Sequence, residues 1–111
     1  MDKLEIMNFD LLLLDVMMPD VTGFVVLEWI RARYSLDALP VIMISALTDD
    51  EDVIKGLELG ANDYVAKPVQ VDILQRRVET QLKIKQMADE RNYIQQRLTE
   101  TNELQNRLMR I

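Results

Sequence analysis

Three polar side chains occupy equivalent positions at the ends of three short apolar segments. Asp15 lies near the end of FDLLLLDV (residues 9–16), Ser45 ends VIMIS (41–45) and Lys67 ends DYVAK (63–67). A carboxylate, a hydroxyl and an ammonium that converge could accept a phosphoryl group, with the carboxylate as nucleophile, the hydroxyl as donor and the ammonium as counter-charge. Each residue alone also has an ordinary structural explanation, as a turn former, a cap or a solvated loop lysine. Their equivalent positions on three successive segments favour a shared site.

The segments that carry these residues have the features of strands buried on both faces of a parallel sheet. They are short, continuously apolar and rich in branched side chains. Helical segments are expected between them, one over residues 24–34 with Thr22 as N-cap, and one from Asp49 with Thr48 as N-cap and Gly60 as terminator. Alternating strands and helices predict an α/β fold, in which ligands bind at the carboxyl ends of the strands.

Composition excludes several kinds of chemistry. The 111 residues include no Cys and no His, which rules out disulfides, thiolate or imidazole metal sites, and nucleophiles activated by His. The longest unbroken apolar run within a predicted strand, residues 11–14, is far too short to cross a bilayer, and no signal peptide is apparent. The sequence therefore predicts a soluble cytoplasmic protein without a membrane partner.

Charge divides unevenly along the chain. Residues 1–71 carry five basic and thirteen acidic side chains, whereas residues 72–111 carry eight basic and six acidic ones. An acidic body repels nucleic-acid backbones, and the mildly basic tail has no Arg-rich or aromatic block. Direct nucleic-acid binding by this segment is therefore not expected.

The tail from Asp72 to Ile111 is an uninterrupted stretch of good helix formers, longer than a usual globular helix. Heptad spacing predicts a coiled-coil seam with three polar members, although a single exposed helix remains the alternative. The seam residues are Ile84, Met87, Arg91, Ile94, Leu98, Thr101, Gln105 and Leu108. We expect a parallel homodimer through this seam, weakened by its polar positions.

The string LLLLDVMMPDVTGF, followed by PVIMISA and then GANDYVAKPV, closely resembles the receiver domain of bacterial response regulators in two-component signalling. One of these motifs alone would mean little, but all three in this order are hard to reach by chance. The resemblance runs from about residue 4 to about residue 82. It implies a flavodoxin-like, doubly wound parallel sheet with strand order 2-1-3-4-5.

The resemblance also implies roles for individual residues. Asp15 corresponds to the phosphoacceptor, Ser45 to the hydroxyl that moves onto the phosphoryl oxygen, and Lys67 to the lysine that pairs with the phosphate. Tyr64 is similar to the switch aromatic, whose ring turns inward once the hydroxyl has moved, although an ordinary half-buried strand aromatic fits equally well. The main-chain carbonyl of Met17 would bind Mg²⁺ together with Asp15, and the peptide bond after Lys67 would be cis.

The sequence departs from the family ahead of the Asp15 strand. A complete receiver has there a strand ending in an acidic pair, a helix, a second strand and another helix, but only nine residues precede Asp10. Residues 1–8 resemble the last turns of that second helix, so we expect a flavodoxin-like sheet that lacks the first two strands. Without the acidic pair, Asp15 and the Met17 carbonyl form an incomplete, weak Mg²⁺ site, which Asp20 is not expected to complete.

Losing those strands would leave residues 11–14 as an edge of four consecutive leucines without a protective charge, proline or bulge. Such an edge tends to pair with another chain, which predicts a second route to a homodimer. We expect two units, a partial receiver domain over residues 1–82 and a helical coiled-coil extension over residues 83–111.

The leading hypothesis is a receiver that takes a phosphoryl group from a histidine kinase or phosphotransfer protein and relays the signal through its C-terminal helix. The alternative is a degenerate receiver that is not phosphorylated and acts as a dimerisation or docking module. An enzyme is disfavoured, because a phosphatase with Asp15 as nucleophile would place a second carboxylate at D-x-D spacing, and residue 17 is Met.

Overall fold

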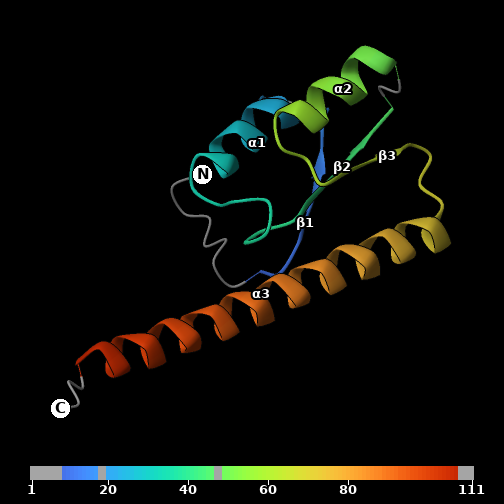
Figure 1. The fold of residues 1–111 in the computed structure, drawn as a ribbon. Helices are drawn as coiled ribbons and strands as arrows, with labels where there is room; N and C mark the ends of the chain where they lie inside the picture. Colours follow the sequence, from blue (N-terminus) through green and yellow to red (C-terminus); the bar gives the residue numbers. More distant parts are fainter. Residues whose placement is uncertain (1–8, 18–19, 47–48, 108–111) are drawn as a thin grey trace.

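The structure is a computed structural model that describes residues 9–17, 20–46 and 49–107, with side chains of the last range as far as residue 99 (Figure 1). In these ranges, strands and helices alternate. They are β1 (Leu12–Asp15), α1 (Gly23–Arg31), β2 (Val41–Ser45), α2 (Asp50–Glu58), β3 (Asp63–Ala66) and α3 (Val71–Arg107). No helix in the described ranges is both long and apolar enough to span a membrane.

The strands form one parallel sheet in the order β1-β2-β3, with β2 in the centre. This order matches the last three strands of the expected 2-1-3-4-5 arrangement, so the predicted α/β class and the positions of all three strands are confirmed. β1 is shorter than the predicted strand because pairing begins at Leu12, whose N–H donates to the carbonyl of Pro40 at 2.9 Å. The helix end expected at residues 1–8 lies outside the described residues.

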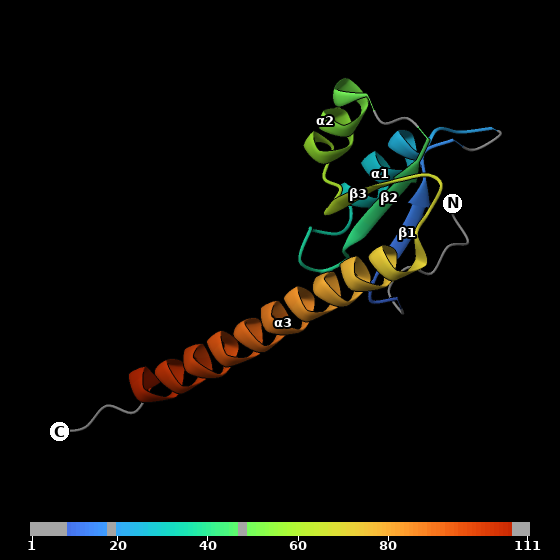
Figure 2. The same cartoon turned by 90° about the vertical axis from the view of Figure 1, so that its right-hand side faces the viewer.

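Helices cover both faces of the sheet. α1 and α2 lie on one face, and α3 runs across the other (Figure 2). The first interface contains the main core, which joins α1 to the alternate residues of β1 and β2. Its fully buried members are Val16, Leu27, Ile30, Leu39, Val41 and Met43. Burying each such side chain is worth about 1.5–3 kcal/mol, which explains why the central strand is apolar throughout.

The ends of the two shorter helices were partly predictable. Thr22 accepts a hydrogen bond from the N–H of Val25 and caps α1, as predicted. Gly60 follows α2 with φ of 108°, a conformation that only glycine adopts without strain, also as predicted. The N-cap of α2 is Asp49 rather than Thr48, which lies outside the described residues.

Arg31 ends α1 three residues earlier than predicted and connects three segments. Its guanidinium donates to the carbonyls of Tyr34, Ser35, Leu39 and Gly60 and to the side-chain oxygen of Asn62, at 2.7–3.3 Å. Asn62 in turn accepts from the N–H of Val41 and donates to the carbonyl of Leu36. Burial lowers the pKa of Arg31 from its usual value. The pair fixes the loop between α1 and β2 against the start of β3.

α3 contains 37 residues, which corresponds to about 55 Å of continuous helix. Ala88 is buried, and ion pairs connect α3 to the acidic body: Arg77 with Asp63, Lys85 with Asp10 and Arg91 with Asp37. Beyond these contacts the helix projects away from the sheet (Figure 1). The proposed boundary after residue 82 falls within this unbroken helix.

β1 forms one edge of the described sheet. It pairs with β2 on one side, and no strand among the described residues pairs with its other side. Leu13 points to the same face as Ile42, its register partner, but its side chain is 49% exposed whereas Ile42 is fully buried. Of the four leucines expected to form an exposed apolar edge, only Leu13 is exposed, whereas Leu14 is buried and the other two are half-buried.

The Arg31 network predicts a substitution-specific loss of stability. Lysine cannot reproduce the planar set of donors, so Arg31→Lys is expected to lower the free energy of unfolding by about 2 kcal/mol. Arg33→Lys is the matched control, because Arg33 is exposed and stacks on Trp29 at 4.1 Å, where a lysine ammonium can also lie. Urea denaturation measures both variants, and equal losses would contradict the prediction.

Candidate functional site

The carboxyl edge of the sheet brings together two of the predicted site residues. Asp15 is the last residue of β1, and Lys67 follows the last residue of β3. The Lys67 ammonium lies 2.5 Å from the Asp15 carboxylate, across the end of the intervening strand β2. Both side chains remain about 40% exposed, so an incoming group can reach them.

Ser45 ends the strand between them and is fully buried. Its carbonyl accepts a hydrogen bond from the N–H of Lys67 at 2.8 Å, and the neighbouring Ile44 carbonyl accepts from the N–H of Val16 at 3.1 Å. Backbone hydrogen bonds thus continue past the strand ends and hold the three site residues in register. The peptide bond between Lys67 and Pro68 is cis, as the resemblance implies.

The Asp15 carboxylate is stabilised in its ionised form. The hydrogen bond from Lys67 has the largest effect and lowers the pKa of Asp15, and the N–H of Met17, which donates to the other carboxylate oxygen at 2.9 Å, lowers it further. Desolvation opposes these effects more weakly. Both oxygens keep a free lone pair, so the group can still act as a nucleophile.

Gly23 is a part of the site whose role the sequence did not reveal. A Cβ at this position would overlap the backbone of Asp15 and lie 2.7 Å from the Cα of Val16. The N–H of Gly23 also donates to the carbonyl of Val16 at 2.8 Å. The first turn of α1 therefore packs directly on the backbone of Asp15. The available signal was a glycine immediately after the helix cap, within the string LLLLDVMMPDVTGF that carries the family resemblance.

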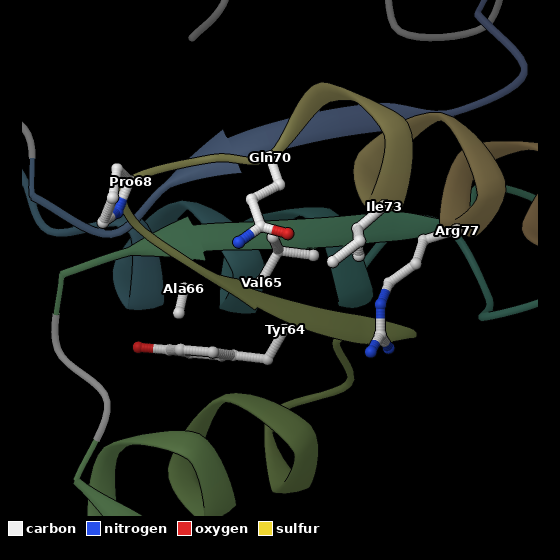
Figure 3. Close-up of a pocket in the computed structure, with 7 residues that line it drawn as sticks. All are labelled: Tyr64, Val65, Ala66, Pro68, Gln70, Ile73 and Arg77. Atoms are coloured by element: carbon white, nitrogen blue, oxygen red, sulfur yellow. The ribbon is translucent and has the colours of Figure 1, made fainter.

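Tyr64 lies on β3 between the sheet and α2. Figure 3 shows its ring on the α2 side of the strand, with the hydroxyl directed toward the end that carries Ala66 and Pro68. Tyr64 also lines a shallow hollow of about 330 Å³, together with residues that include Ile73 and Arg77 of α3. The ring is half-buried, between the site and this open edge of the sheet.

The donors at the site fit Mg²⁺ only in part. Asp15 offers a carboxylate and Met17 a main-chain carbonyl, which are hard oxygen ligands of the kind that Mg²⁺ prefers. Within the described residues, no group of three or more acidic, His or Cys side chains could hold a metal. Water and phosphoryl oxygens would therefore have to supply much of an octahedral shell around Mg²⁺ bound by these residues.

Comparison with known proteins identifies the family. The sequence profile of the response regulator receiver domain matches residues 1–79, which include the three strands and the Asp15–Lys67 pair. The chain belongs to the response regulator receiver family. The fold is correspondingly that of the flavodoxin-like receivers, extended by the long helix α3.

Individual receiver-containing relatives cover about two thirds of the chain. The transcriptional regulatory protein AfsQ1 of Streptomyces coelicolor is 49% identical over 74 residues, and GltR of Pseudomonas aeruginosa is 44% identical over 73. These matches cover 67% and 66% of this chain but only 32% and 30% of the relatives, so the chain spans about a third of their length. The crystal structure of the Thermotoga maritima regulator DrrB superposes with a TM-score of 0.63 at 41% identity, covering 68% of this chain and 34% of DrrB.

The lowered pKa of Asp15 predicts a measurable response to loss of Lys67. The ion pair contributes stability above the usual carboxyl range, and this contribution is lost as the pH falls through the lowered pKa of Asp15. Lys67→Met removes the charge but keeps the length, so the pKa of Asp15 should rise toward its ordinary value. Carbon-detected NMR titration of the Asp15 carboxyl measures the change, and an unaltered pKa would contradict the assigned cause.

Proposed function

We propose that this chain acts as a phosphoacceptor receiver, which takes a phosphoryl group on Asp15 from a histidine kinase or phosphotransfer protein in the cytoplasm. The observation that carries the proposal is the direct contact between the exposed Asp15 carboxylate and the Lys67 ammonium at the carboxyl edge of the sheet. Family membership supports it, because the profile match includes both residues.

The transfer requires few protein groups. An Asp15 oxygen attacks the phosphorus, the bond from phosphorus to the donor nitrogen breaks, and the imidazole of the donor leaves with its electron pair. Lys67 then neutralises the charge on the phosphoryl oxygens, and Ser45 is the candidate hydroxyl donor. Mg²⁺, when bound through Asp15 and the Met17 carbonyl, would offset further negative charge. The chain acts here as the acceptor, and Met17 lies where a phosphatase would place a second acidic side chain.

Mass spectrometry after incubation with acetyl phosphate and Mg²⁺ tests this function. One phosphoryl group should be added to Asp15, stable in acid and lost at high pH, and Asp15→Asn should abolish it. Asp20→Asn is the matched control, because Asp20 is exposed, lies in the adjacent loop and should leave the labelling intact. A folded chain that stays unmodified would favour the alternative of a degenerate docking module, and labelling that persists in Asp15→Asn would contradict the site.

We further propose that α3 relays the signal through a homodimer. The seam side chains Ile84, Met87, Ile94 and Leu98 are 47–67% exposed, which is unusual for large apolar residues at regular spacing. A hollow of about 340 Å³ between Asp37 and α3 continues the seam at its body end, lined by Ile84, Met87 and Arg91. A second copy of the helix fits this elongated surface. The seam members Thr101, Gln105 and Leu108 lie outside the residues with described side chains.

The oligomeric states of two variants show whether the dimer contact is the seam of α3 or the edge strand β1. Ile94→Asp places a charge in the seam beyond the body, so the mass of the chain in light scattering should fall from twice 13.0 kDa to 13.0 kDa. Leu13→Lys, which charges the exposed face of β1 instead, should leave the dimer intact. The opposite pattern would assign the dimer to the strand edge, and a monomeric unmodified chain would contradict both routes.

A further inference from the structure

Gly56 occupies an unfavourable place for its residue type. It lies in the interior of α2, and it is buried. Glycine destabilises a helix interior relative to alanine, because it loses more backbone freedom on folding. A buried glycine in the interior of a short helix therefore points to a packing requirement on the face that meets the sheet.

The neighbours of Gly56 show what the requirement is. A Cβ at this position would lie 3.0 and 3.2 Å from two carbons of the Tyr64 ring and 3.2 Å from the sulfur of Met43. Tyr64 and Met43 are register partners on β3 and β2, so their side chains stand side by side on the face that α2 covers. The missing side chain of Gly56 leaves the space into which the Tyr64 ring fits.

Met43 and Tyr64, the two side chains nearest to Gly56, are not equally free to move. Met43 is fully buried, whereas Tyr64 is half-buried at the edge strand. Any atom added at Gly56 therefore displaces the ring more readily than the thioether. The carbonyl of Gly56 also accepts a hydrogen bond from the N–H of Ala61 at 3.0 Å, which ties this point of α2 to the segment leading into β3.

We propose that Gly56 is the positioning residue for Tyr64. Its bare backbone sets how closely the ring packs against α2, and thereby sets the balance between this ring position and any other that follows phosphorylation. The claim that Gly56 sets the packing of the ring rests on packing alone. The claim that it sets the balance of ring positions rests on the proposed function, in which Tyr64 responds to phosphorylation of Asp15.

A double-mutant cycle tests the packing. Gly56→Ala in the unmodified chain should lower the urea midpoint, because the methyl group meets the ring. The same substitution in a Tyr64→Ala background should raise the midpoint, because the clash is gone and alanine is the better helix former. A shift of the same sign in both backgrounds would overturn the proposal. If the Gly56→Ala single variant unfolds, the comparison in the Tyr64→Ala background still tests the contact.

The position of the Tyr64 ring can be measured directly, and it would not change if Gly56 affected only the stability of the chain. With 3-fluorotyrosine incorporated, the ¹⁹F signal that disappears in Tyr64→Phe reports Tyr64. Gly56→Ala should shift this signal and leave those of Tyr34 and Tyr93 in place, and acetyl phosphate with Mg²⁺ should change it by a different amount in the variant. An unshifted signal in Gly56→Ala would overturn the positioning role. If Gly56→Ala moves the signal but phosphate does not, the proposed switch fails while the positioning role stands.

Discussion

The register of β2 against its two neighbours is the constraint on which the site depends. Asp15 ends β1 and Lys67 directly follows β3, and each is positioned by backbone hydrogen bonds to β2 that continue past the last paired residues. Side chains alternate between faces along a strand, so a slip of one residue would turn Asp15 to the other face. The apolar side chains of β2 are almost all buried, which makes any such slip costly. The core thus specifies the geometry of the ion pair.

Two glycines allow α1 and α2 to pack closely against residues at the carboxyl edge of the sheet. Gly23 lets α1 begin directly on the backbone of Asp15, and Gly56 lets α2 lie against the Tyr64 ring. Both contacts leave no room for a methyl group without a displacement. The helices on one face therefore contact Asp15 and Tyr64 directly.

Electrostatics and apolar packing have different roles in the attachment of α3. The ion pairs with Asp63, Asp10 and Asp37 connect a mildly basic helix to an acidic body, but most of the charged groups are well exposed and such pairs are individually weak. Ala88 of α3 is buried, as are Ile42 and Val65 of the sheet. Because burial of apolar surface contributes more to stability than exposed ion pairs do, we expect the ion pairs to favour the orientation of α3 and to supply little of its attachment. The relatives AfsQ1 and GltR are longer proteins, and the segment that matches this chain makes up about a third of each.

The sequence by itself determined the alternation of strands and helices, because apolar runs, caps and a terminal glycine are local signals. It also placed Asp15, Ser45 and Lys67 at equivalent strand ends, which in a parallel sheet must share one edge. Only the tertiary structure decided that Asp15 and Lys67 touch, that Arg31 has five acceptors from separate segments, and that Gly23 and Gly56 are sites of close approach. The ion pair and the bonds from Arg31 to Gly60 and Asn62 join residues distant in the chain. The close approaches at the two glycines follow from how the helices pack on the sheet, which no local pattern encodes.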